Sequence, residues 1–107
     1  MPKLRLPLRR GAAARIPERL ADLHGPAVGT VVLPVHLTWH GLREFDVSDR
    51  PGRLLLYTIV LSKGTRNDVA RFVHPQLLRE DWPRLRALIA PQVRDACARR
   101  FGLALPG

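Results

Sequence analysis

The sequence predicts one mainly helical α+β domain, in which a small extended region packs on four or five short helices. A length of 107 residues is typical of a single hydrophobic core, and 46% hydrophobic with 25% charged residues is typical of a globular chain. One stretch rich in β-branched residues and several helix start and stop signals indicate the mixture of elements. We therefore divide the chain into a basic N-terminal arm or short strand, residues 1–15, and one globular domain, residues 16–107.

The first part of the domain combines a short helix with the extended region. Residues 16–23 (IPERLADL) favour a helix, because Pro17 suits a first helical position and the pair Gly25-Pro26 stops it. The following GTVVLPVHLTWHG predicts one or two extended segments divided at Pro34. We expect the strands of the domain here.

The run from Leu54 to Leu61 is apolar on every side, so periodicity alone cannot distinguish a buried strand from a buried helix. Two candidate caps, Asp46 and Ser48, precede the run, and a Lys-Gly pair follows it. Because these are helix start and stop signals, we predict a helix.

Three further helices are predicted beyond this run. Thr65 and Asp68 form the T-x-x-D pattern of a capping box, which predicts a short helix that ends at about Val73. A second helix, residues 76–81, is expected to break or restart at the following Trp-Pro pair, because an interior proline loses a hydrogen bond. The last helix, residues 91–101, is expected to end at a glycine and to bury one apolar face.

The aromatic residues are expected to anchor the packing of the core. They are few, so each one matters where it falls in the chain. The six are Trp39, Phe45, Tyr57, Phe72, Trp82 and Phe101.

Basic charge is concentrated at the two ends of the chain. The net charge is +9, of which residues 1–19 carry +5 and residues 84–107 carry +4, whereas residues 20–83 are balanced. This distribution favours an acidic partner, either nucleic-acid phosphates or an acidic protein surface, although 16 Arg against 2 Lys also fits a GC-rich coding bias. The candidate partner-binding or nucleic-acid-binding residues are Arg5, Arg9, Arg10, Arg15, Arg84, Arg86, Arg94, Arg99 and Arg100.

No group of residues has the pattern typical of a catalytic or metal site. His36 and His40 are four residues apart, which in an extended segment separates them by about 13 Å, too far for one ion. Ser48 and Ser62 lie outside any nucleophile elbow, and Cys97 is expected to be a buried, unreactive thiol. We therefore expect a non-catalytic protein without cofactor or metal.

The sequence also favours a cytoplasmic location. Its longest apolar run is far shorter than the roughly 20 residues that cross a bilayer, and the basic N-terminus lacks the apolar core of a secretory signal. A single cysteine fits a reducing compartment.

From residue 29 to residue 101 the chain carries LPVHLTWHG, then FDVSD, then LLLYTIVLSKGTRNDVARFVHPQLLREDW, and finally a VRDAC helix. This order and spacing resemble a group of small proteins of high-GC bacteria. A departure is Asp95-Ala96-Cys97, where the group often has an aromatic residue. The matching positions are Trp39, Phe45, Asp46, Tyr57, Gly64, Asp68, Leu78, Trp82, Pro83 and Arg94.

Members of that group resemble the small partner genes that stand beside nucleotidyltransferase-like toxins of the AbiEii type. The resemblance implies an antitoxin-like or regulatory role. From the charge distribution we expect the basic ends of the chain to dock on an acidic surface of the partner or on the nucleic acid that this surface would bind. The alternative is a DNA-binding regulator that uses the Arg-rich C-terminal helix and the basic N-terminal arm.

Overall fold

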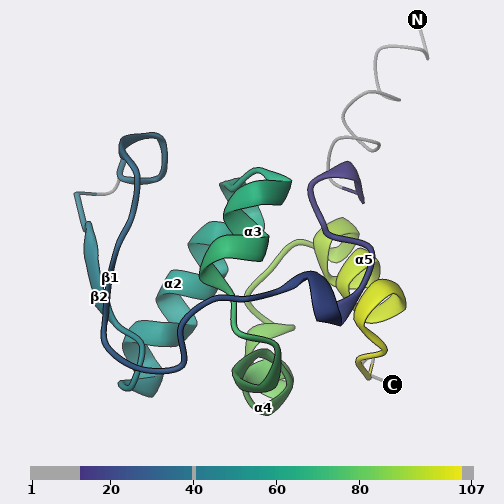
Figure 1. Ribbon diagram of the computed structural model, residues 1–107. Helices are drawn as coiled ribbons and strands as arrows, with labels where there is room; N and C mark the ends of the chain where they lie inside the picture. Colours follow the sequence, from purple (N-terminus) through teal and green to yellow (C-terminus); the bar gives the residue numbers. More distant parts are fainter. Residues whose placement is uncertain (1–12, 40, 105–107) are drawn as a thin grey trace, which may run out of the picture.

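The computed structural model describes residues 13–39 and 41–104, which form four α-helices and one two-stranded antiparallel sheet (Figure 1). This confirms the mainly helical α+β class. In Figure 1 the β-hairpin lies at one end of the molecule, α5 lies at the other, and α2, α3 and α4 lie between them. The elements in chain order are η2 (Leu20–Asp22), β1 (Thr30–Val32), η3 (Val35–Leu37), β2 (Glu44–Asp46), α2 (Arg50–Lys63), α3 (Arg66–Phe72), α4 (Pro75–Leu85) and α5 (Pro91–Phe101), where η marks a 3-10 helix.

The apolar run predicted as a helix is the body of α2. Its N-cap is Asp49, whose carboxylate accepts a hydrogen bond from the Gly52 N–H at 3.0 Å. Neither of the two candidate caps, Asp46 and Ser48, is the N-cap, and the Ser48 N–H donates to the Asp46 carboxylate in the turn that precedes α2. The run is apolar all round because α3, α4, β2 and η3 all pack against this helix.

The helix predicted over residues 16–23 is reduced to the single turn η2. Arg19 is extended, and the next segment forms backbone hydrogen bonds with the end of α3, from the His24 N–H to Ala70 O and from the Gly25 N–H to Val73 O. A Cβ at Gly25 would lie 2.4 Å from a backbone atom of Phe72. These long-range bonds hold residues 24–25 against α3, where a continued helix has no room.

The extended region forms one strand before Pro34, and the segment after that proline is the 3-10 turn η3 instead of a second strand. The second strand, β2, comes from residues expected only to lead into the helix. In the register Val31 lies opposite Phe45, and both are buried. Gly41, with φ +89°, adopts the left-handed conformation in the connection that brings the chain back antiparallel.

The helix predicted to break at Trp82-Pro83 runs unbroken through α4. Pro83 lies only two residues before the end of the helix and on its exposed side, so the lost backbone hydrogen bond lies near the terminus. Trp82 is buried, and its indole N–H donates to the carbonyl of Ala104, which ties the segment after α5 to α4.

Other predicted features are confirmed. The capping box of Thr65 and Asp68 starts α3, and α5 buries Val93, Cys97 and Phe101 before it ends at a left-handed glycine. Five of the six aromatic residues are buried, but Trp39 is 61% exposed and is no core anchor.

Candidate functional site

Of the nine arginines proposed from the sequence, the structure describes six, and two of these six, Arg15 and Arg100, are engaged within the fold. Arg5, Arg9 and Arg10 lie outside the described residues. Arg15 donates to the carbonyls of Leu61 and Gly64, at 3.0 and 2.8 Å, and its burial lowers the pKa of the guanidinium.

Arg100 is also engaged within the fold, because its guanidinium donates to the backbone carbonyls of Ala13 and Ile16. Together Arg15 and Arg100 fasten residues 13–16 to α2 and α5. Buried carbonyls need such donors, so these two side chains have a structural role that the sequence does not reveal.

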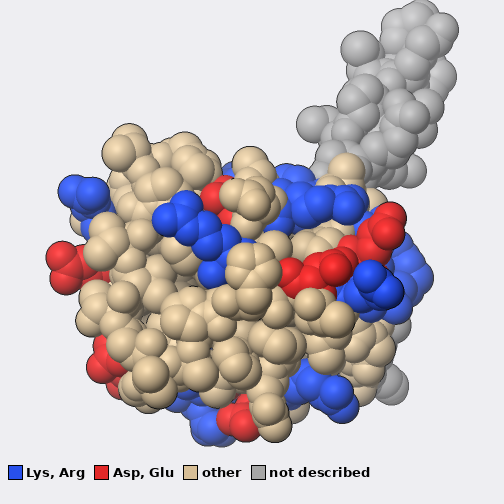
Figure 2. Space-filling view, viewed as in Figure 1, with Lys and Arg blue, Asp and Glu red and all other residues tan. Residues whose placement is uncertain are grey.

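The four remaining candidates belong to α4, α5 and the loop that joins them. Arg84 and Arg99 are exposed, and Arg86 is half-buried with a long contact of 3.5 Å to the Ala104 carbonyl. Arg94 Nε lies 3.7 Å from the Asp95 carboxylate. On the face shown in Figure 2, charged side chains of both signs gather towards α5, whereas uncharged side chains cover most of the hairpin side.

The hairpin presents a different kind of surface. The bonds from the Leu33 N–H to Arg43 O and from the Val47 N–H to Gly29 O continue the strand register beyond both ends of the sheet. The odd-numbered residues Val31, Leu33, Phe45 and Val47 therefore face the helices and are all buried, whereas Gly29 and Arg43 at the ends of the register are exposed. The even-numbered residues of the two strands face away from the helices and are exposed.

Large apolar side chains gather on and beside this outer face. Among the described residues seven large hydrophobic side chains are exposed, and five of them fall within residues 28–42. We call these five the hairpin patch: Val28, Val32, Val35, Trp39 and Leu42. By register Val28, Val32 and Leu42 belong to the outer face, whereas Val35, 80% exposed, and Trp39 lie in the connection between the strands.

Two carboxylates accompany the patch on the outer face. Glu44 lies directly opposite Val32, and Asp46 lies opposite Thr30. Residues two apart on one strand are separated by about 7 Å, so the two carboxylates are neighbours. None of the ion pairs among the described residues involves either of them, and the one hydrogen bond that the Asp46 carboxylate accepts from a described residue comes from the Ser48 N–H.

A hydrogen bond fixes the hairpin to the helices. Nε2–H of His36, in η3, donates to Oδ2 of Asp68 at 2.7 Å, and the same carboxylate accepts from the Thr65 N–H at the start of α3. Burial alone would raise the pKa of Asp68, but the hydrogen bonds from His36 and Thr65 hold it below its ordinary value. The 3-10 turn η3, which begins with Val35, is therefore anchored to α3 through its middle residue, His36.

The cysteine and the histidine that the structure describes among the candidate chemical groups are both engaged within the fold. Cys97 is fully buried in α5, and desolvation raises the pKa of its thiol to about 12. His36 pairs with Asp68, and His40 lies outside the described residues. Within residues 13–39 and 41–104 no three His, Cys, Asp or Glu side chains are grouped closely enough to hold a metal ion, and no helix is long and apolar enough to cross a membrane.

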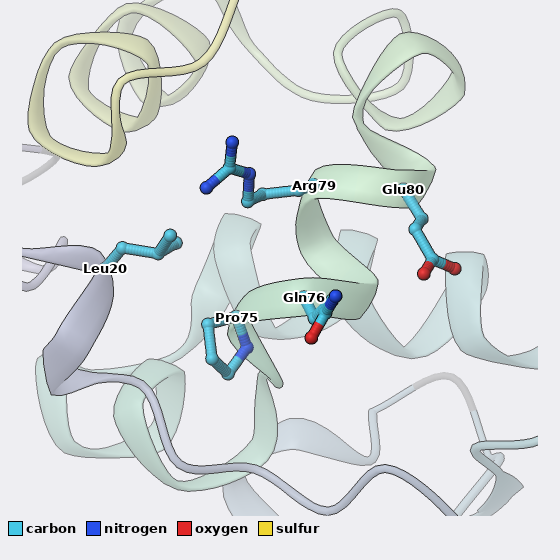
Figure 3. A pocket seen from close by; sticks show the side chains of 5 residues that line it. All are labelled: Leu20, Pro75, Gln76, Arg79 and Glu80. Atoms are coloured by element: carbon cyan, nitrogen blue, oxygen red, sulfur yellow. The ribbon is translucent and has the colours of Figure 1, made fainter.

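An open hollow lies between η2 and the first two turns of α4 (Figure 3), lined by Leu20, Pro75, Gln76, Arg79 and Glu80. In Figure 3 Leu20 and Arg79 extend into this space, whereas the Glu80 carboxylate points away along the other side of α4. Arg79 is thus the one charged side chain that enters the hollow among the five that are shown.

Comparison with known proteins gives no match: no family model, no characterised protein and no solved structure is similar to this chain.

Proposed function

We propose that this protein is a non-catalytic binding protein, the antitoxin-like or regulatory partner of a nucleotidyltransferase-type toxin, and that it docks on this toxin through the hairpin patch. The observation that carries the proposal is the concentration of five of the seven exposed large hydrophobic side chains of the described residues within residues 28–42.

Exposed apolar side chains that gather in one place are typical of interaction sites, because their burial against a partner removes apolar surface from water. Trp39 strengthens this interpretation, since tryptophan is among the residues that most often dominate the free energy of binding. The His36–Asp68 bond supports it further, because a surface that is held in place before binding loses less entropy when the complex forms.

The toxin class comes from the resemblance of the sequence to partner genes of nucleotidyltransferase-like toxins. Trp39 is one of the positions that carry this resemblance, yet its side chain is 61% exposed and contributes little to the core. A position of this kind is better explained by binding than by folding.

A protein partner is favoured over duplex DNA by the placement of the arginines. Phosphate binding requires side chains that are free to reach the nucleic acid, whereas Arg15 and Arg100 donate to backbone carbonyls of their own chain. No arginine belongs to the described outer face of the hairpin by register. We therefore treat DNA binding as the alternative result that the experiment must be able to detect.

The experiment is calorimetric titration of the purified chain with a nucleotidyltransferase-like toxin of the AbiEii type. The variant Val35→Ser/Trp39→Ala is expected to weaken binding at least 30-fold, because central aromatic anchors are each worth about 2 kcal/mol or more. The matched control is Leu88→Ser, which removes an exposed leucine, 54% exposed, from the loop between α4 and α5 and is expected to change affinity less than threefold.

Two results would contradict the proposal. The first is absence of a complex with the toxin at micromolar concentrations. The second is binding to duplex DNA that falls steeply with salt and is lost in Arg84→Ala/Arg99→Ala, while the hairpin variant binds normally. That second result would replace the toxin partner with DNA.

A further inference from the structure

From the charge and register of the hairpin, we infer that its outer face recognises a basic and apolar segment of the partner, a stretch that carries lysine or arginine beside apolar side chains. This inference rests on the proposed function, because it specifies the chemistry of the surface on the toxin that meets the hairpin patch.

The first step is the composition of the outer face. By register its described residues between 28 and 46 comprise apolar Val28, Val32, Pro34 and Leu42 together with Thr30, Glu44 and Asp46. All of the ionisable groups in that set are acidic.

The second step is that no ion pair among the described residues neutralises the carboxylates of Glu44 and Asp46, and this includes the exposed Arg43 that precedes Glu44. The described ion pairs join other groups, and the nearby Arg50 is directed to the buried Asp81, with Nε 3.5 Å from Oδ1. Glu44 and Asp46 repel each other on a face where each stands opposite an uncharged residue, Val32 and Thr30. A partner cation relieves that repulsion and forms charge-assisted hydrogen bonds.

The third step is that this local charge opposes the charge of the whole chain. A protein with net charge +9 attracts acidic partners at long range. At contact distance, however, the neighbouring carboxylates determine which charge the outer face prefers in a partner, because charges beyond about 8 Å are largely screened at physiological salt. The inference and the net charge therefore predict opposite preferences, which makes the two easy to separate.

The experiment uses three fluorescein-labelled peptides of twelve residues that share four leucines at helical spacing and differ only in their polar positions, which are all lysine, all glutamine or all glutamate. Fluorescence anisotropy with the full chain measures each affinity at physiological salt. We expect the lysine peptide to bind at least tenfold more tightly than the glutamine peptide, and the glutamate peptide to bind most weakly.

Charge variants locate the preference. Glu44→Gln/Asp46→Asn is expected to weaken the lysine peptide at least tenfold, and the new amide at position 46 keeps an acceptor for the Ser48 N–H. The matched control, Glu18→Gln/Glu80→Gln, removes two exposed carboxylates elsewhere and changes the net charge equally, so it is expected to alter affinity less than twofold. Thermal unfolding of each variant verifies that the fold is retained.

Three results would overturn the inference: tighter binding of the glutamate peptide, equal loss in the variant and its control, or a concentration-dependent dimer of the chain that Trp39→Ala abolishes. The last result would assign the face to a second copy of this chain. Failure here is distinguishable from failure of the proposed function. If toxin binding depends on Val35 and Trp39 but not on Glu44 and Asp46, the charge preference alone is wrong.

Discussion

Arg53 of α2 and Asp81 of α4 form a buried bidentate ion pair, with Nε to Oδ2 at 2.6 Å and a second guanidinium nitrogen to Oδ1 at 2.9 Å. The same guanidinium donates to the Val47 carbonyl at the end of the hairpin. One side chain therefore connects α2, α4 and the segment after β2. The hydrogen bond to Asp81 raises the pKa of Arg53 above its ordinary value.

Removing Asp81 is expected to destabilise the fold by about 3–5 kcal/mol, because the Arg53 charge stays buried without a counterion. Removing Arg53 is expected to cost less, because Arg50 Nε still lies 3.5 Å from the Asp81 carboxylate. Urea unfolding of Arg53→Met and Asp81→Leu measures the effect. The double variant is expected to be more stable than either single variant, since it buries no unpaired charge. Single variants within about 1 kcal/mol of the wild type would show that the pair contributes little.

Asp68 makes the stability of the folded protein depend on pH in the acid range. Its pKa lies below the ordinary value of 3.8 in the folded state, so its contribution to stability is present above pH 3.8 and is lost as the pH falls through the lower folded value. Unfolding experiments between pH 5 and pH 2 are expected to show this loss, and Asp68→Asn is expected to flatten it. His36→Ala removes one hydrogen bond to the Asp68 carboxylate, so the stability of this variant is expected to begin to fall at a higher pH than that of the wild type. An identical pH profile for His36→Ala and the wild type would contradict this role for His36.

His74 is an unusual helix cap, because its Nδ1 accepts hydrogen bonds from the N–H groups of Gln76 and Leu77 at the start of α4. His74→Ala is expected to reduce the free energy of unfolding by about 1 kcal/mol, as the loss of a side-chain cap usually does. His74→Asn supplies another acceptor and is expected to recover most of that loss. Equal stability of the two variants, measured in urea, would mean that the cap contributes nothing.

Cys97 is expected to resist thiol reagents in the folded protein. Its burial raises the pKa of the thiol to about 12, so almost no thiolate exists at pH 8 and no reagent reaches it. Reaction with a chromogenic disulfide is expected to be slow in buffer and complete in minutes in concentrated urea. Rapid stoichiometric reaction of the folded chain would place the cysteine at the surface.

The sequence suffices for features that local chemistry determines. The capping box of α3, the glycine end of α5 and the buried face of α5 follow from residues within a few positions of one another. Naming Asp46 and Ser48 as candidate caps of α2 in place of Asp49 is a small error of the same local kind, because several adjacent residues can accept the bond.

Features that depend on distant contacts are not predictable in this way. The path of residues 24–25 is determined by bonds to α3, and β2 exists because Phe45 pairs with Val31 across a glycine-containing connection. The same holds for the candidate site. Charge counting points to the arginines of the two ends, but it cannot reveal that Arg15 and Arg100 serve backbone carbonyls, or that Trp39 is exposed beside the hairpin.

The central claim is that the hairpin patch is the surface that binds the toxin, and fluorine NMR tests it most directly. The chain has two tryptophans, of which Trp39 is exposed and Trp82 is buried against the Ala104 carbonyl, so labelling with 5-fluorotryptophan gives one reporter and one internal control. On addition of the unlabelled toxin, the resonance of Trp39 is expected to shift or broaden while that of Trp82 stays in place. A complex that forms and leaves the Trp39 resonance unchanged would contradict the claim.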